Sequence, residues 1–109
     1  MKENKDKKEY LKSYRALDRR TKEIGGYLAS GQQEHEGLLK KKLECEIKKS
    51  EIVAAIHRIG NTEEEEVLEL RYIQGKGWEY ICAKMNYGKT KVFEMHREAL
   101  GKIIICKRK

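Results

Sequence analysis

The chain contains no proline among its 109 residues, whereas Leu, Lys, Glu and Arg are abundant. Proline interrupts helices, and these four residue types favour them. Hydrophobic and charged residues each make up 39% of the chain, which allows one modest domain with a small core. The composition therefore predicts an all-α protein rather than a sheet protein.

Cysteine is scarce, and apolar runs are short. Cys45, Cys82 and Cys106 are odd in number and form no C-x-x-C pair, which argues against a disulfide framework and a zinc ribbon. The first eight residues lack the apolar run of a signal peptide, and the aliphatic run at residues 103–105 is far too short to span a membrane. We expect a reduced cytoplasm, no membrane, no metal and no cofactor.

Charge is distributed unevenly around a net value of +7. Residues 1–24 carry nine bases and five acids, residues 60–70 carry five acids and no base, and residues 86–109 carry seven bases and two acids. A basic excess at both ends is typical of a nucleic-acid-binding surface. Many other soluble proteins are basic, so this observation alone selects no partner.

Two amphipathic helices are predicted in the first half of the chain. Residues 7–28 carry a heptad-like stripe that Gly25 and Gly26 should end or bend; it comprises Tyr10, Tyr14, Leu17, Thr21, Ile24 and Leu28. Residues 29–37 read as a loop. Residues 38–59 carry one stripe of Leu38, Cys45, Ile52 and Ile59 and an adjacent one of Leu39, Leu43, Ile47, Ser50 and Ala54. We expect an antiparallel hairpin that packs on the C-terminal unit, a second copy or another protein.

A third helix is predicted from residue 62 to Gly75. Asn61 or Thr62 suits the N-cap position, and Glu65 lies where a capping box requires an acid. The acidic run 63–66 also suits the positive end of a helix. We therefore interpret this run as a helix start, with a metal site or an acidic docking patch as the alternative.

The segment from Trp78 to Ile103 has the pattern of a helix-turn-helix. Asn86 falls where the chain must turn sharply through a left-handed residue, and Gly88 would cap the second helix. Six positions fit the motif: Ile81, Cys82, Met85, Asn86, Val92 and Met95. Such a unit places its second helix in the DNA major groove. The alternative is a plain helical hairpin.

Side chains on the outward, N-terminal part of this second helix are the candidates for DNA contact: Lys89, Thr90, Lys91, Phe93, Glu94 and Arg97. Lys and Arg bind guanine edges or phosphates, Thr does either, and Glu accepts from a cytosine amino group. Phe93 would touch a thymine methyl group or cover the core edge. The tail of residues 107–109 would add non-specific attraction to phosphates.

Other conspicuous residues have simpler interpretations. His96 would donate to a phosphate or, as we favour, be a half-exposed structural histidine. Trp78 should anchor the core, and Tyr10, Tyr14 and Tyr27 should pack within the hairpin. His35 and His57 show no ligand spacing with a cysteine.

Residues 70–100, L-R-Y-I-Q-G-K-G-W-E-Y-I-C-A-K-M-N-Y-G-K-T-K-V-F-E-M-H-R-E-A-L, resemble region 4 of sigma-70-type factors. They are more closely similar to small sigma-like proteins of phages and prophages of Gram-positive bacteria. One family of unknown function among these starts with Y-L-x-x-Y-R-x-L-D-R-R, which residues 10–20 match. Serine often stands in that family where this chain has Gly77 and Gly88.

The resemblance implies a regulator of phage transcription in the cytoplasm of a bacterial host. Base contacts carried over from sigma region 4 fall on Lys89, Thr90, Phe93, Glu94 and Glu98. Phe93 and Glu98 depart from the polar or basic residues often found there, so no operator sequence follows. The segments with which a full sigma factor melts promoters are missing, so we do not expect this chain to direct initiation alone.

The sequence thus predicts an N-terminal helical hairpin, residues 1–60, followed by a three-helix, sigma region 4-like helix-turn-helix unit with a basic tail, residues 61–109. The main hypothesis is a regulator that binds double-stranded DNA, with RNA polymerase as a further partner and a homodimer formed through the hairpin. One alternative is a small terminase-like subunit for phage DNA packaging. Another is a protein-docking module that no longer binds DNA. We expect no enzymatic activity, because no nucleophile–base pairing, phosphate loop or metal spacing is present.

Overall fold

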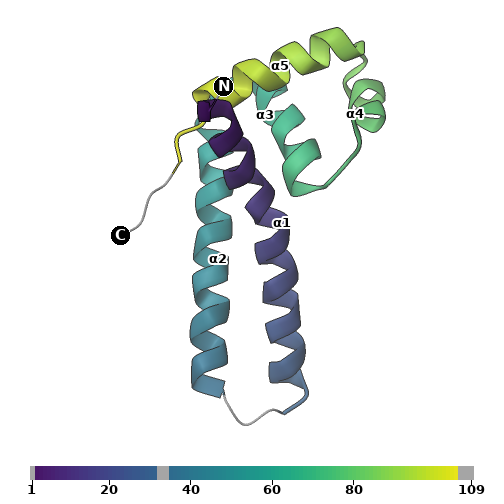
Figure 1. The fold of residues 1–109 in the computed structure, drawn as a ribbon. Helices are drawn as coiled ribbons and strands as arrows, with labels where there is room; N and C mark the ends of the chain where they lie inside the picture. Colours follow the sequence, from purple (N-terminus) through teal and green to yellow (C-terminus); the bar gives the residue numbers. More distant parts are fainter. Residues whose placement is uncertain (1, 32–34, 106–109) are drawn as a thin grey trace.

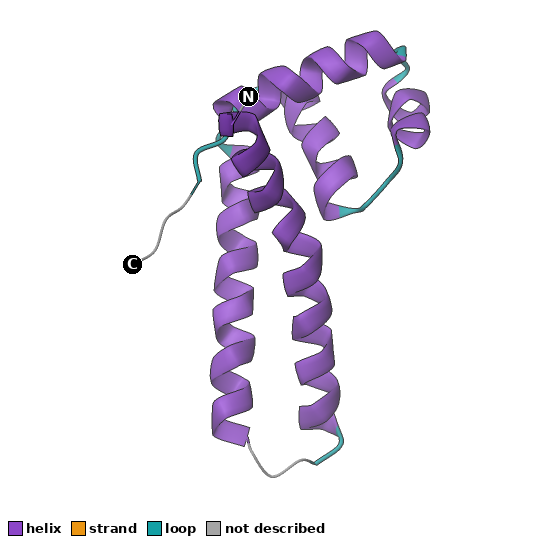
Figure 2. Ribbon diagram, in the orientation of Figure 1, coloured by secondary structure: helices purple, strands orange, loops and turns teal. Residues whose placement is uncertain are grey.

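The computed structural model describes residues 2–31 and 35–105, and this part of the chain contains helices and no strand (Figures 1 and 2). The all-α prediction is confirmed. The elements follow in the order α1 (Lys2–Ala29), α2 (His35–His57), α3 (Thr62–Leu68), a π-helical segment η1 (Glu69–Ile73), α4 (Trp78–Met85) and α5 (Lys89–Lys102). None of these described helices is both long enough and apolar enough to cross a membrane.

The helices α1 and α2 lie side by side and antiparallel, and the other helices gather at one end of this hairpin (Figure 1). The boundaries differ from those predicted. Helix α1 continues through Gly25 and Gly26, where we expected a stop or bend, because Ile24 is buried and holds this turn against its neighbours. Helix α2 begins at His35, so Glu36 and Gly37 are helical rather than part of the loop.

A first hydrophobic cluster joins the hairpin to the C-terminal helices. Leu11 of α1 meets α2, the α3–η1 segment and α5 there; the other buried members are Ile52, Ala55, Ile56, Leu68, Tyr72, Ala99, Leu100 and Ile103. This cluster therefore contains residues from both predicted parts of the chain, 1–60 and 61–109. Tyr10 and Tyr14 pack against it as predicted, whereas Tyr27 is 56% exposed, so its predicted packing role is wrong.

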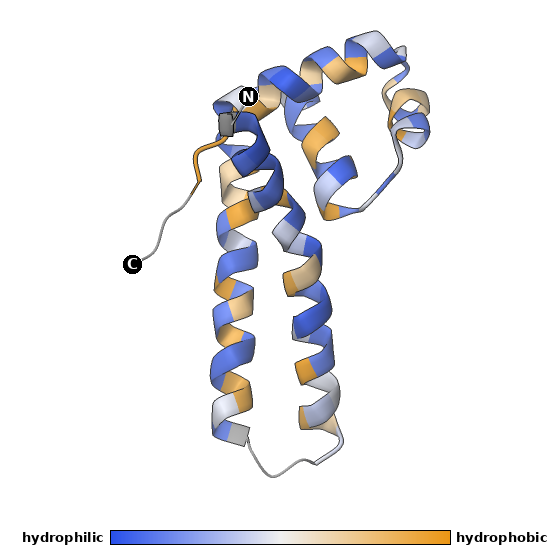
Figure 3. Cartoon of the chain, in the orientation of Figure 1, coloured by the Kyte–Doolittle hydropathy of each residue, from blue (hydrophilic) through white to orange (hydrophobic). Residues whose placement is uncertain are grey.

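The two apolar stripes of α2 have different surroundings. Cys45 and Ile52 of the first stripe are buried against the rest of the molecule. The second stripe points to the opposite side, where Leu39 is 53%, Leu43 60% and Ile47 38% exposed. In Figure 3, hydrophobic residues recur along α2, whereas α1 is largely hydrophilic. Helix α2 thus offers an aliphatic face that nothing in the described chain covers.

The start of α3 is capped as the sequence indicates. The Asn61 side chain accepts a hydrogen bond from the backbone N–H of Glu64 (3.0 Å), and the Glu65 carboxylate accepts one from the N–H of Gly60 (2.9 Å). Asn61, rather than Thr62, is the N-cap. The acidic run also reaches beyond its own helix, since the buried Glu64 pairs with Lys102 of α5 at 2.7 Å.

Candidate nucleic-acid interface

A tight turn joins α4 to α5 and sets the direction in which α5 leaves. Asn86 adopts the left-handed conformation (φ 62°, ψ 42°), as predicted, and the N–H of Tyr87 bonds to the carbonyl of Cys82 at 3.1 Å. The Tyr87 hydroxyl donates to the carboxylate of Glu63 at 2.6 Å. This contact ties the turn to the start of α3, so the α4–α5 geometry is supported from outside the turn itself.

A second hydrophobic cluster lies beneath the turn. Ile81 and Val92 are fully buried, and Met95 is nearly so. Cys82 and Met85 are half-buried and pack against the same cluster, which also includes Val67 and Leu70 of the α3–η1 segment. All the apolar positions predicted for the motif therefore face inward together. The arrangement is compatible with the predicted helix-turn-helix.

The opposite side of α5 carries the DNA-contact candidates, and each of these side chains is exposed: Lys89, Thr90, Lys91, Glu94, Arg97 and Glu98. At 3.6 residues per turn, Thr90, Glu94 and Arg97 share the centre of the outward face. Lys89 and Lys91 lie at the start of this face and Arg97 near its middle. The Glu94 carboxylate lies between these cations, and the Glu98 carboxylate follows Arg97. Such a face offers both donors and acceptors to base edges.

Phe93 lies at the border of this face and is 43% exposed. Its ring stands nearly perpendicular to that of Trp78, with ring centroids 5.0 Å apart. Of the two roles expected for Phe93, covering the core edge is therefore the one with a visible contact. Trp78 is half-buried against the second cluster, as predicted, and the Arg71 guanidinium lies over its ring at 4.5 Å.

His96 is buried rather than half-exposed, so that part of its predicted role is wrong. Its exposed fraction is 8%, and its Nε2 lies 2.7 Å from the Tyr72 hydroxyl. Burial, together with the nearby charges of Lys8 and Arg71, lowers the pKa of His96 to about 4. Burial also raises the pKa of Tyr72 to about 12. Both groups are thus neutral near pH 7, and His96 is a core residue rather than a phosphate donor.

The first turns of α4 and α5 differ from that of α3. Gly77 and Gly88 are their N-caps and supply no side-chain hydrogen bond, whereas Asn61 caps α3. The amide N–H groups at these two helix starts lack a side-chain acceptor from the cap residue. Helix N-termini of this kind attract phosphate oxygens through their N–H groups and their dipole.

The family model described as "Protein of unknown function (DUF1492)" matches residues 31–103. The chain belongs to this family. No curated protein and no solved structure matches it. The DUF1492 match extends from α2 to the end of α5, and it therefore contains every residue of the α4–α5 unit.

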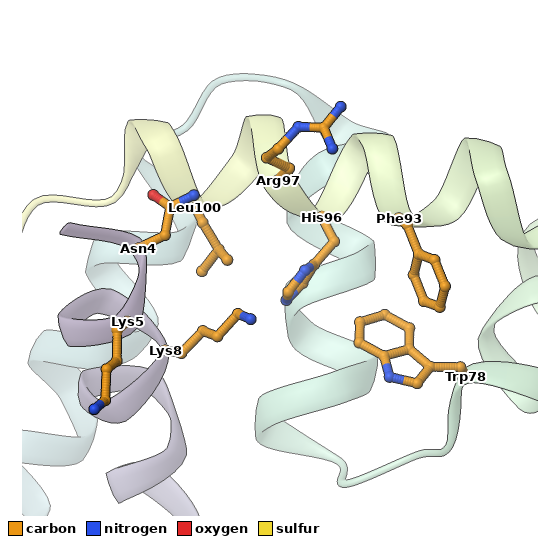
Figure 4. A pocket seen from close by; sticks show the side chains of 8 residues that line it. All are labelled: Asn4, Lys5, Lys8, Trp78, Phe93, His96, Arg97 and Leu100. Carbon is orange, nitrogen blue, oxygen red and sulfur yellow. The ribbon is translucent and has the colours of Figure 1, made fainter. Parts of the chain in front are cut away.

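The start of α1 lies outside the DUF1492 match, yet the structure brings it beside α5. Asn4, Lys5 and Lys8 line one side of a basic groove of about 570 Å³, and Phe93, Arg97 and Trp78 line the other (Figure 4). The sequence motif alone predicts no DNA contact from the first helix. The basic excess of residues 1–24 was the available signal, but only the fold shows which of those lysines approach α5.

Residues 107–109, the predicted phosphate-binding tail, lie outside the described part of the chain. His35 begins α2, and His57, at its end, lies on the surface 3.4 Å from the carboxylate of Glu69.

Proposed function

We propose that this protein is a DNA-binding transcriptional regulator of phage or prophage genes that inserts α5 into the major groove. The observation that carries the proposal is the division of α5 into two faces. Val92, Met95 and Ala99 anchor one face in the core, and the opposite face presents only exposed polar and charged side chains around Thr90 and Glu94. A rigidly held helix with a polar outer face suits direct reading of base edges.

The roles of individual residues follow from their chemistry. Lys89 and Lys91 lie in the first turn of α5, where the uncapped N–H groups would also favour a phosphate. Arg97, further along the same face, would bind guanine or the backbone, and Glu94 and Glu98 would accept from cytosine amino groups. The presence of two acids would make affinity depend on the bases opposite them, which favours specificity over general attraction.

The hairpin would supply a second function, dimerisation. The exposed stripe of Leu39, Leu43 and Ile47 is aliphatic surface of the kind that protein partners cover. A dimer would present two copies of α5 to two half-sites, which enlarges a contact area that is small for one motif.

The test is selection of binding sites from a pool of random duplex DNA at two salt concentrations, followed by measurement on the selected site. The double variant Lys89→Ala, Lys91→Ala should lose roughly 1–3 kcal/mol of binding free energy for each lysine that makes a good base contact. The control Lys41→Ala, Lys48→Ala removes the same charge from exposed positions of α2.

Each result separates the hypotheses. An enriched sequence that the Lys89, Lys91 variant no longer binds supports the regulator. Unchanged affinity in that variant contradicts α5 as the recognition helix. Binding without enrichment favours the DNA-packaging subunit, and ring-sized particles in a solution mass measurement would support it. Absence of binding at both salt concentrations favours a module that docks on RNA polymerase or another regulator.

A further inference from the structure

We propose that the first turns of α1 bind the DNA phosphate backbone alongside α5, through Lys5 and Lys8 in the basic groove. This inference rests on the proposed function and adds a second contact region to it. The ligand is one strand of the sugar–phosphate backbone of duplex DNA. Residues of the hairpin would then hold the duplex directly rather than serve only as a support for α5.

The position of the basic groove relative to α5 is the first argument. Thr90, Glu94 and Arg97 mark the outward centre of α5, and Phe93 lies about 100° around the helix from Glu94. The groove opens on the Phe93 side. A helix in the major groove has a phosphate backbone on each flank, because the two strands form the walls of that groove. The flank that carries the basic groove would therefore face one strand.

The charges of the basic groove are the second argument. Lys5, Lys8 and Arg97 contribute three cations, and among the described residues no carboxylate lines the groove. In Figure 4, the Lys8 side chain extends toward His96, whereas the ends of the Lys5 and Arg97 side chains point outward, away from the other labelled residues. The ion pairs found between described residues involve none of these three cations. The positive charge of the groove therefore comes from three separate side chains of α1 and α5, which suits an extended polyanion rather than one small anion.

The two flanks of α5 differ at its C-terminal end, and this contrast is the third argument. On the flank away from the groove, Lys102 pairs there with the buried Glu64 at 2.7 Å. On the side of the basic groove, the end of α5 is instead fixed to α1, since the Lys7 ammonium donates to the carbonyl of Gly101 at 3.1 Å. This bond and the burial of Leu11 hold the first turns of α1 beside α5. Lys5 and Lys8 are thus carried on a helix whose position relative to α5 is set by packing.

The experiment compares the salt dependence of binding for the full-length wild type and for Lys5→Gln, Lys8→Gln, on the selected site and on a random duplex. The slope of log K against log salt should fall by about 0.9 for each phosphate that the variant no longer binds, or about 1.8 for both. The two duplexes should be affected equally, because binding to the backbone carries no sequence information. Lys5→Arg, Lys8→Arg should retain the wild-type slope, and Lys41→Gln, Lys48→Gln is the control with matched charge.

The outcomes distinguish this inference from the proposed function. If the wild type binds its site but the Lys5, Lys8 variant keeps the full slope, the inference is wrong and the regulator remains. If the variant binds only the selected site more weakly, the two lysines do not act on the backbone and the inference is again wrong. If the wild type binds no DNA, both fail. Both lysines are exposed, so an unchanged thermal unfolding midpoint should accompany the expected decrease in slope.

Discussion

Helices α2 and α5 bury one face each in the same core, but their outward faces differ. The outward face of α2 carries Leu39, Leu43 and Ile47, whereas that of α5 carries charged and polar side chains around Glu94. The inward faces differ less, since both contribute buried aliphatic residues, Ile56 and Leu100, to the first cluster. From a buried face one can infer only that the helix packs in the fold. The chemistry of an exposed face indicates what kind of partner the helix can bind.

The two outward faces suit two different kinds of partner. Aliphatic surface is stabilised by another protein surface, because burial removes it from water. Charged surface is suited to a polyanion, because binding to phosphates releases counterions. We therefore infer that α2 and α5 address different partners, and each of the following predictions changes one side of this comparison.

The largest expected effect comes from changing the outward face of α2. Leu43→Glu together with Ile47→Glu places four carboxylates near the two-fold axis of the proposed dimer, and like charges in an interface oppose association by several kcal/mol. The dimer dissociation constant, measured by analytical ultracentrifugation, should rise by at least about 100-fold. The control Lys41→Gln, Lys48→Gln makes the same change of net charge at exposed positions away from the stripe.

The same variant separates the two surfaces. Its α5 face is intact, so it should still bind a single half-site but no longer bind the complete site tightly. A wild type that is monomeric at all concentrations, or a variant that remains dimeric, would contradict the assignment of this stripe to a second copy. In the first case, a protein of another kind, such as RNA polymerase, would be the partner to test.

The next effect concerns the inward face of α5, where His96 is the exception to apolar packing. Its pKa in the fold is about 4, below the ordinary value of 6.5, so the unfolded chain binds the proton more readily. This contribution to stability is complete above pH 6.5 and is lost as the pH falls from there to about 4. The two pKa values correspond to at most about 3 kcal/mol of unfolding free energy.

Urea unfolding at a series of pH values tests this expectation. The variant His96→Gln should show a flatter dependence than the wild type between pH 4 and 6.5, because its side chain does not titrate. The control His57→Gln makes the same substitution at an exposed imidazole at the end of α2. Identical curves for wild type and His96→Gln would show that His96 is accessible to protons in the fold.

These features also show which parts of the molecule were predictable. The turn at Asn86 was predicted correctly, and the cap of α3 was narrowed to Asn61 or Thr62, because each depends on a few neighbouring residues. The burial of His96 and the path of α1 past Gly25 were not, because they depend on residues distant in sequence. Lys8 is the clearest case, since only the packing of α1 against α5 brings it into the basic groove. Periodicity located the stripes of α2 but did not determine which stripe the fold would bury.

The smallest effect concerns the turn that aims the outward face of α5. Asn86→Val should destabilise the fold by about 1–2 kcal/mol, because a β-branched residue is disfavoured at φ 62°, whereas Asn86→Gly should be nearly neutral. Ala83→Val, at an exposed helical position of α4, should cost no more than about 0.7 kcal/mol. Equal losses for the valine variants at positions 83 and 86 would mean that the left-handed turn is not required. A decrease in DNA affinity in Asn86→Val that exceeds its decrease in stability would show that the direction of α5, and not only its surface chemistry, sets the binding.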